Sequence, residues 1–321
     1  MTTTNAVQAE GLVKVFGDVR AVDGVDLEVR PGEIFGVLGP NGAGKTTTLR
    51  MLATLLGIDA GEARIFGVDV RREPHRIRQL VGVTGQYASV DENLTATENL
   101  WMFGRLLGLR SGDARASTRT LLAQFGLQEA ADKPISAFSG GMRRRLDLAA
   151  SLITRPPLIF LDEPTTGLDP RTRGQMWDTI RELVESGSTV LLTTQYLDEA
   201  DQLADRIAVI DHGRVVADGT PAELKESVGG LTLHLVVADP RRRADAALVL
   251  HEVTGQVPQD DGVVLAAPIR SGAVTSDVVL ALTARGIEIA ELSAARPSMD
   301  EVFFALTGVL DAAGPEQRDA A

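Results

Sequence analysis

Residues 39–47 read GPNGAGKTT, which matches the phosphate-binding loop pattern GxxxxGK[ST]. The apolar run Ile34 to Leu38 before it suits a buried strand, and Thr46 to Leu56 has the apolar spacing of a helix. The loop therefore joins the end of a strand to the start of a helix, which is the context that the pattern requires. A glycine-rich turn that binds nothing is the alternative, and this context argues against it.

The residue types in the loop indicate how it would hold a nucleotide. Glycines let the backbone fold closely enough for N–H groups to point at phosphate oxygens, and the helix dipole adds positive potential. We expect Lys45 to reach the β and γ phosphates, and the Thr46 hydroxyl to bind the Mg²⁺ that bridges them. The sequence thus predicts that the chain binds and hydrolyses ATP. The predicted nucleotide-binding residues of the loop are Gly39, Pro40, Asn41, Gly42, Ala43, Gly44, Lys45, Thr46 and Thr47.

Composition bounds the class of protein. The chain has 321 residues, of which 44% are hydrophobic, so it has ample core material for one large domain or two moderate ones. A formal net charge of -12 argues against nucleic acid binding, which needs a clustered basic face. The densest basic runs, Arg143 to Arg145 and Arg241 to Arg243, are interpreted as solvated helix faces or linker charge. The absence of cysteine excludes disulfides and thiolate metal sites, as is typical of cytoplasmic proteins.

The sequence offers no segment suited to membrane insertion. The first residues, MTTTNAVQAE, have neither a basic region nor an apolar core, so we expect no signal peptide. No apolar run approaches the roughly 18 residues that a transmembrane helix needs. We therefore expect no direct membrane span, so that any work at a membrane would need another chain to cross it.

Strands alternating with helices predict an α/β fold. Ala6 to Phe16 and Val25 to Val29 read as antiparallel strands before the phosphate loop. Further strands at Leu158 to Leu161 and Thr189 to Thr193 flank a helix at Arg171 to Glu185, which indicates a mostly parallel core sheet. The ATPase domain is expected over residues 6–227, with an inserted helical subdomain at about 87–155.

The composition restarts after Gly229 and Gly230, which we interpret as a hinge. Residues 231–309 contain two βαβ-like passes and predict a small α+β domain, with a ferredoxin-like arrangement as the suggested topology. Residues 310–321 are small and polar, and we expect a disordered tail there.

Further motifs follow the phosphate loop in an order and spacing that resemble the ATP-binding cassette ATPases. They are Gln86 in VTGQYASVDE, FSGGM at 138–142, LIFLDEP at 158–164, GLDP at 167–170 and TTQYLDEAD at 193–201. The resemblance covers about residues 6–227. Segments such as SGGMRRRLDLAASL and PSMDEVFFALTG resemble more narrowly the ATP-binding subunits of daunorubicin and doxorubicin resistance exporters from actinomycetes. That family implies drug efflux through a separate transmembrane permease, with the ATPase attached peripherally at the cytoplasmic face of the membrane.

Two carboxylates after an apolar strand would carry the chemistry. Asp162 can hold Mg²⁺ through water, with Thr46 as a complementary ligand, and Glu163 is placed to polarise the attacking water. Ordinary capping of a helix or loop is the alternative for this pair. The resemblance implies that Gln86 is linked both to Mg²⁺ and to the permease.

The resemblance also implies a head-to-tail homodimer. In the family, Ser139, Gly140 and Gly141 of one copy clamp the γ-phosphate held by the loop of the other, and Asp169 helps to connect the two sites. A glycine pair where a loop meets a helix can expose backbone N–H groups to an anion in this way. In isolation, such a segment would be interpreted as a flexible turn.

One aromatic residue and two departures from the family's usual residues also bear on the site. Phe16 lies where the family often stacks an aromatic ring on adenine, although a core phenylalanine at a strand end is the alternative. Met142 replaces the glutamine that usually closes the FSGGM motif, a change that we expect to be tolerated. Gln195 replaces a histidine, and its amide can hydrogen-bond phosphate and water but cannot become cationic. We expect hydrolysis to survive this change, and any effect on its rate to be a decrease.

Two other functions compete with an exporter motor. One is a nucleotide-dependent regulator or scaffold that uses the same dimer without transport. The other is a nucleic-acid or ribosome-associated member of the superfamily, which the acidic charge and single cassette argue against. A neighbouring gene encoding about six apolar stretches would favour the exporter.

Overall fold

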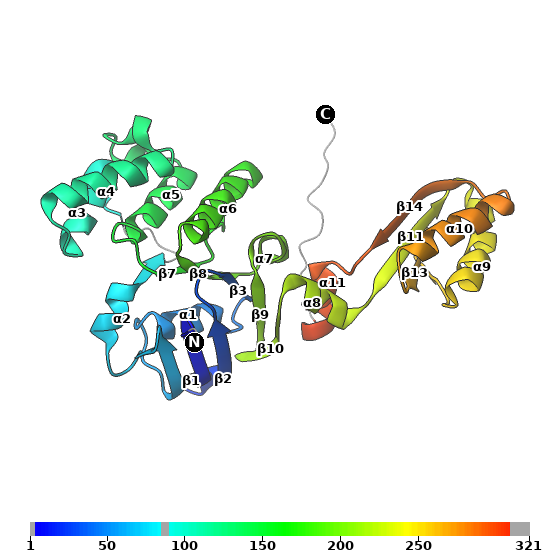
Figure 1. The fold of residues 1–321 in the computed structure, drawn as a ribbon, viewed down its shortest axis with the longest axis horizontal. Helices are drawn as coiled ribbons and strands as arrows, with labels where there is room; N and C mark the ends of the chain where they lie inside the picture. The colour runs from blue at the N-terminus through cyan, green and yellow to red at the C-terminus, as the bar shows by residue number, and fades with distance from the viewer. Residues whose placement is uncertain (1–3, 85–89, 309–321) are drawn as a thin grey trace. The chain divides into compact units, whose positions relative to one another are not determined.

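The computed structural model describes residues 4–84 and 90–308, and these form two compact units, Met1–Thr220 and Pro221–Ala321 (Figure 1). The division falls after Thr220 and not near Ser227. Helix α8 (Pro221–Val228) belongs to the second unit because it packs against α11 (Met299–Thr307). The tail expected at 310–321 lies outside the described residues.

The first unit begins with an antiparallel sheet in the order β2-β1-β4-β5. Its strands are β1 (Val7–Phe16), β2 (Val19–Val29), β4 (Ala60–Ile65) and β5 (Val68–Asp69). Strand β2 starts well before the expected Val25, because register shifts in the β1–β2 ladder accommodate Gly24, whose φ is 79°. The antiparallel N-terminal strands are thus confirmed.

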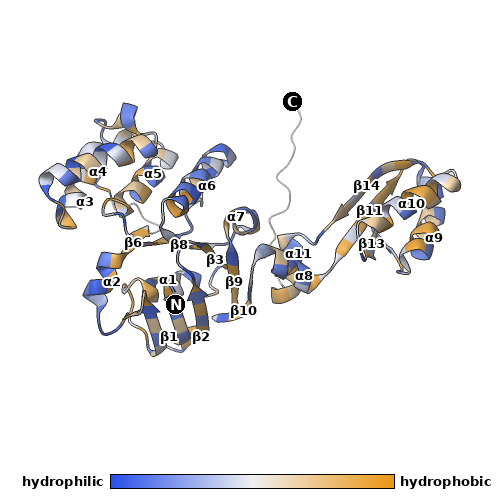
Figure 2. Cartoon of the chain, in the orientation of Figure 1, coloured by the Kyte–Doolittle hydropathy of each residue, from blue (hydrophilic) through white to orange (hydrophobic). Residues whose placement is uncertain are grey.

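The core sheet has six strands in the order β10-β9-β3-β8-β7-β6, all parallel except β10 against β9. They are β3 (Ile34–Leu38), β6 (Val81–Thr84), β7 (Leu158–Asp162), β8 (Thr189–Thr194), β9 (Arg206–Asp211) and β10 (Arg214–Gly219). The predicted mostly parallel sheet is therefore confirmed. Figure 2 contrasts the strongly apolar strand β9 with the mixed hydrophilic and hydrophobic turns of helix α6 (Pro170–Glu185).

Side chains on the two faces of this sheet enter different cores. Leu158 and Phe160 of β7 pack with the antiparallel sheet, whereas Ile159 and Leu161 pack with the helical subdomain. The alternation follows from the two-residue period of a strand that is covered on both faces. Helix α1 (Lys45–Leu52) fills the space between the two sheets, since it contacts β2 as well as β7 and β8. It ends before the expected Leu56 because Thr54 adopts a left-handed φ of 61°.

The expected helical subdomain is present, and Figure 1 shows its helices on the side of the unit away from β1 and β2. A capping box begins α3 (Ala96–Leu106), in which the Thr95 side chain accepts from Glu98 N–H and the Glu98 carboxylate accepts from Thr95 N–H. The other helices and 3₁₀ turns of the subdomain are α4 (Ser111–Gln124), η1 (Gln128–Ala130), η2 (Ile135–Ala137) and α5 (Gly140–Ser151). Helix α2 (Pro74–Leu80) precedes the subdomain and packs in the core of the antiparallel sheet, and α6 and α7 (Leu197–Leu203) flank the last core strands.

The second unit contains an antiparallel sheet in the order β12-β13-β11-β14. With its helices it runs β11 (Leu231–Val237), η3 (Pro240–Arg242), α9 (Arg243–Thr254), β12 (Gln259–Asp260), β13 (Leu265–Ile269), α10 (Ala273–Ala284) and β14 (Ile289–Ala295). This βαββαβ order confirms the suggested ferredoxin-like topology. Across both units, the described residues include no helix with the length and apolarity needed to cross a bilayer.

Candidate active site

The candidate site lies where parallel strands of the core sheet end. The register pairs Leu38 of β3 with Thr194 of β8, and Asp162 of β7 with Thr193 of β8. The segments that follow these strands therefore leave the sheet at the same edge, which is where open α/β sheets bind their ligands. This brings Glu163 to the phosphate loop, and Gln195 leaves the same edge at the end of the neighbouring strand.

Close backbone packing explains two glycines of the phosphate loop. A Cβ on Gly39 would lie 2.2 Å from the Ile210 carbonyl oxygen, and a Cβ on Gly44 would lie 2.4 Å from the Ala21 carbonyl oxygen. Gly44 also has a φ of 105°, which favours glycine, and it forms the N-cap of α1. The first N–H groups of α1 have no acceptor within the helix and face the loop. The loop thus presents the backbone donors that an anion requires.

Lys45 closes the loop from within. Its side chain is only 4% exposed, and its ammonium donates to the carbonyl oxygens of Gly39 at 2.7 Å and Pro40 at 3.0 Å. The positive charge is therefore held beside a cavity of about 200 Å³. The described residues lining this cavity are Ala21, Asn41, Gly42, Ala43, Gly44, Lys45, Thr46, Thr47 and Glu163.

Asp162 is the buried centre of a hydroxyl–carboxylate cluster. Its Oδ1 accepts from Thr46 Oγ1 at 2.8 Å and from Thr193 Oγ1 at 2.7 Å, and the residue is 2% exposed. Oxygen donors of this kind suit Mg²⁺, which commonly takes only one or two protein ligands beside substrate phosphates. The donor set therefore fits the ion. Thr193 was quoted in the sequence only as a strand end and as the start of TTQYLDEAD, so its contact with Asp162 was missed.

Glu163 leaves the strand in a backbone conformation that is uncommon for a residue with a side chain. Its φ is 50°, and its N–H donates to both the carbonyl oxygen and Oγ1 of Thr193 at 3.1 Å each. The turn directs the residue to the wall of the phosphate cavity, and Thr166 Oγ1 donates to its Oε2 at 3.3 Å. A carboxylate at this position can accept a proton from water.

Three other predicted residues occupy different surroundings. Gln195 directly follows β8 and is half-buried, although it does not line the cavity as described. Phe16 is 48% exposed at the end of β1, with Lys14 Nζ 5.5 Å from its ring centre. An exposed ring is available for stacking, and the alternative of a core phenylalanine is wrong. Gln86 lies outside the described residues.

The FSGGM segment forms the start of α5 and does not line the phosphate cavity of its own chain. Ser139 is the N-cap, and its Oγ accepts from the N–H of Met142 at 3.3 Å. Ser139 and Gly140 are exposed. A Cβ on Gly141 would lie 2.9 Å from Thr172 Cγ2, so this glycine permits the N-terminal turns of α5 and α6 to approach each other.

Asp169 is the N-cap of α6 and joins this contact. Its carboxylate accepts from the N–H of Thr172 at 2.9 Å and from Thr172 Oγ1 at 2.7 Å. These hydrogen bonds lower the pKa of Asp169 below its ordinary value, and the one from the Thr172 N–H has the largest effect. The structure thus brings Gly141 and Asp169 together through Thr172, apart from the residues of the phosphate cavity.

The interpretation of Arg143 to Arg145 as a solvated helix face is wrong. Arg144 is half-buried and donates to backbone carbonyl oxygens at the end of β7 and in the segment that follows it. Arg143 pairs with Glu92 at 2.6 Å, and Arg145 donates to the Phe125 carbonyl oxygen at 3.1 Å. Charge alone could not reveal these contacts, because their partners lie far away in the sequence.

Glu199 is a second residue that sequence reasoning missed. It is fully buried in α7, where its Oε1 accepts from Thr165 Oγ1 at 2.8 Å and from Trp177 Nε1 at 3.1 Å. Burial raises the pKa of this carboxyl group above its ordinary value. Glu199 thereby links α7, which follows Gln195, to the loop after Glu163 and to α6.

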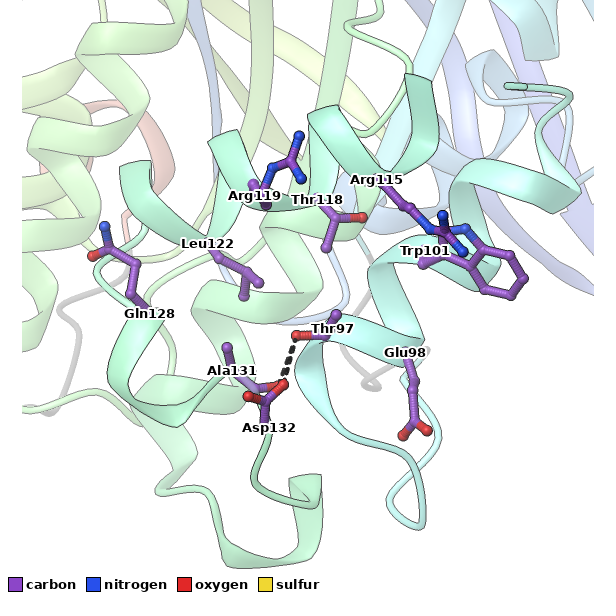
Figure 3. Close-up of a pocket in the computed structure, with 10 residues that line it drawn as sticks. All are labelled: Thr97, Glu98, Trp101, Arg115, Thr118, Arg119, Leu122, Gln128, Ala131 and Asp132. Carbon is purple, nitrogen blue, oxygen red and sulfur yellow. Dashed lines mark hydrogen bonds between the residues drawn. The ribbon is translucent and has the colours of Figure 1, made fainter. Parts of the chain in front are cut away.

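A separate cavity of about 720 Å³ lies in the helical subdomain. Figure 3 shows Leu122 and Ala131 among its walls, with Trp101 beside Arg115 and a hydrogen bond between Thr97 and Asp132. Of the predicted site residues that the structure describes, none lines it. It is therefore distinct from the phosphate cavity.

Comparisons with known proteins agree with the geometry. A family model described as ABC transporter matches residues 22–166. The daunorubicin/doxorubicin resistance ATP-binding protein DrrA of Streptomyces peucetius is 55% identical over 307 residues, covering 95% of this chain and 93% of that protein. A daunorubicin resistance ATP-binding protein of Streptomyces coeruleorubidus is 50% identical over 310 residues, covering 94% of this chain and 95% of that protein.

A solved structure shares the fold of the first unit's cassette. The dimeric structure of the ATP-binding cassette MJ0796, in a post-hydrolysis state bound to ADP and Pi, has a TM-score of 0.62 and 26% identity. The match covers 67% of this chain and 98% of the MJ0796 chain. With relatives of 50% identity or more that span nearly its whole length, the chain belongs to the family of ATP-binding subunits of ABC transporters, and it is an ATP hydrolase.

Proposed function

We propose that this chain is the ATP-hydrolysing motor of an exporter that removes drugs of the anthracycline class, working as a head-to-tail homodimer with a separate membrane permease. The observation that carries the proposal is the convergence of Lys45, Thr46, Asp162 and Glu163 at one edge of the core sheet. The relatives named for daunorubicin and doxorubicin resistance support the choice of cargo.

In this proposal each residue of the cavity has one task. The loop N–H groups and Lys45 bind the β and γ phosphates of ATP. Thr46 and Asp162 hold Mg²⁺, with Gln86 as a further ligand, and the bound ion supplies charge neutralisation as the γ-phosphoryl group is transferred. Glu163 orients the attacking water and accepts its proton, while the Gln195 amide donates to the γ-phosphate. Phe16 stacks on adenine.

The separation between two groups of residues supports the proposed dimer. The exposed Ser139 and Gly140 do not line the phosphate cavity of their own chain, although the start of α5 offers unsatisfied N–H groups to an anion. A second copy would place these groups on the γ-phosphate and Asp169 near the junction. The dimer named for MJ0796 supports this arrangement.

The permease would hold the chain at the cytoplasmic face of the membrane. The described residues include no membrane-spanning helix, so the chain would need such a partner in order to power transport across a bilayer. ATP binding would close the dimer, and hydrolysis with product release would reopen it. The permease would change its access to each side of the membrane in step with this cycle.

Two substitutions test the assigned chemistry in the full chain. Glu163→Gln should retain ATP binding and lose turnover at least about tenfold, because the amide cannot accept the proton of the attacking water. Lys45→Ala should instead lose ATP affinity, since it removes charge-assisted contacts to the phosphates. ATP binding and steady-state phosphate release measure the two effects. Near-parental turnover of Glu163→Gln would contradict the role of this carboxylate.

A further inference from the structure

Three consecutive backbone carbonyl groups at the end of β7 share one donor, the guanidinium group of Arg144. Its Nη2 donates to the Asp162 oxygen at 3.0 Å and to the Glu163 oxygen at 2.8 Å, and its Nε donates to the Pro164 oxygen at 3.0 Å. Arg144 lies in the second turn of α5, which begins at Gly140. A single side chain from the helix of the FSGGM segment therefore contacts the segment that carries Glu163.

These contacts replace hydrogen bonds that regular structure cannot supply. The φ of 50° at Glu163 turns the chain out of the strand, so its carbonyl groups leave the sheet ladder while still partly buried. A planar guanidinium with several donors in a fixed fork suits such a set of acceptors, whereas an ammonium group is a compact point charge. The left-handed region is strained for a residue with a side chain, so the conformation persists only where its surroundings fix it.

The backbone of Glu163 is fixed from both sides. On one side, its N–H donates to the Thr193 carbonyl oxygen and hydroxyl. On the other side, its carbonyl oxygen accepts from Arg144. Negative charge on Asp147, Asp162 and Glu163 lies near the guanidinium and offsets part of the cost of its burial.

We propose that Arg144 is a positioning residue for ATP hydrolysis, which holds the turn after β7 so that the Glu163 carboxylate faces the phosphate cavity. Through Arg144, a movement of α5 would be transmitted to Glu163, so that engagement of the FSGGM segment and alignment of the carboxylate are linked. The inference rests on the proposed role of Glu163, and the contacts that carry it lie within a single chain.

Arg144→Lys in the full chain tests the inference, with Arg145→Lys as the matched control. Lysine keeps the charge but cannot span the three carbonyl oxygens, so we expect kcat to fall about tenfold or more while the KM and Kd for ATP change less than about threefold. Arg145 contacts the Phe125 carbonyl oxygen in the helical subdomain, and Arg145→Lys should keep kcat within about twofold. A parental kcat in Arg144→Lys, or a loss confined to KM, would overturn the proposal.

A double substitution distinguishes positioning of Glu163 from a general structural role. If Arg144 acts through the Glu163 carboxylate, adding Arg144→Lys to Glu163→Gln should lower the residual single-turnover rate by less than about twofold. A further tenfold loss in that background would contradict the mechanism. Should Arg144→Lys fail to fold by circular dichroism, Arg144→Gln is measured against the same criteria, because its amide keeps two donors.

The single substitutions separate this inference from the proposed function. A fully active Glu163→Gln would remove the proposed role of Glu163 itself. An inactive Glu163→Gln together with a parental Arg144→Lys would leave that role intact and overturn only the positioning by Arg144.

Discussion

Individual residues at the end of the core sheet combine neutral and charged hydrogen-bonding groups in a small space. Asp162 accepts two hydroxyl donors, Glu163 faces the phosphate cavity and Gln195 follows the neighbouring strand. Because Gln195 stays neutral, proton transfer depends on Glu163 alone in the proposed mechanism. The chemistry of the site therefore separates into phosphate contacts and one proton acceptor.

Substitution of Gln195 should separate nucleotide binding from turnover. Gln195→Ala removes a hydrogen bond to the γ-phosphate and water, and we expect it to bind ATP while losing roughly 2–4 kcal/mol of transition-state stabilisation. Gln195→His should retain substantial activity and gain a pH dependence at about 6–7, where imidazole titrates. ATPase rates against pH at saturating Mg²⁺ and ATP measure both. Parental hydrolysis by Gln195→Ala would show that this side chain does not assist the reaction.

Buried Glu199 should make stability depend on pH. Burial favours its neutral form, so its pKa in the folded protein exceeds the ordinary value near 4.5. In the parent, the stabilisation that comes from burying the protonated carboxyl group is fully present below that ordinary value. This stabilisation is lost as the pH rises through the raised pKa. Glu199→Gln is neutral at every pH, so its Tm relative to the parent should rise as the pH increases above that ordinary value and through the raised pKa. A Tm difference that is flat or falls over this range would contradict the prediction.

Secondary-structure elements were predictable where their signals are local. The run from Ile34 to Leu38, the glycine spacing of the loop and the helix after it identify β3, the phosphate loop and α1 without tertiary information. Strand β4 reads AGEARI, whose alternating charged positions give little apolar signal, and in α2 only Ile77 is buried. These elements acquire their structure mainly from pairing with β1 and packing in the first unit.

The site was predictable to a similar extent. Its loop and carboxylates carry short motifs, whereas Arg144 and Glu199 act through partners many positions away in the sequence. The contacts of Arg144 span 18 to 20 positions, and that of Glu199 with Thr165 spans 34. No composition or periodicity encodes such a contact, so the fold must be known first.

The phosphate loop should tolerate no side chain at its first glycine. A Cβ at Gly39 would lie 2.2 Å from a carbonyl oxygen of β9, so Gly39→Ala must displace the backbone. We expect a loss of about 1–3 kcal/mol in unfolding free energy and a fall of more than tenfold in ATP affinity. The control is Gly174→Ala in α6, where a Cβ meets no atom within 4 Å and alanine should stabilise the helix by about 0.5–1 kcal/mol. Equal effects of the two substitutions, measured by denaturant unfolding, would contradict the packing argument.

The whole molecule consists of a cassette and a second compact unit with its own apolar core. Leu233, Leu235, Val249 and Leu282 belong to that second core, which lies between the antiparallel sheet and helices α9 and α10. All the residues that we assign to nucleotide chemistry precede Thr220. We therefore expect the second unit to act in assembly, through the dimer or the permease.

Truncation after Thr220 should separate chemistry from assembly. Residues 1–220 should fold and bind ATP, because their cores contain no residue of the second unit. Dimerisation, coupling to the permease, or both should weaken. Circular dichroism, ATP binding and analytical ultracentrifugation provide the measurements, and an unfolded truncated chain would show that the cassette depends on the second unit.

The composite site is the central claim, and complementation between two inactive variants tests it most directly. Lys45→Ala disables the phosphate loop, and Gly140→Asp places a carboxylate where the γ-phosphate of the other copy would bind, at a position where a Cβ meets no atom within 4 Å. Each variant alone should be inactive. Mixed in equal amounts, they should regain up to about a quarter of parental ATPase activity, because half of the dimers would contain one intact site formed by the Lys45 of one chain and the Gly140 of the other. No recovery in a mixture that demonstrably forms heterodimers would contradict the account.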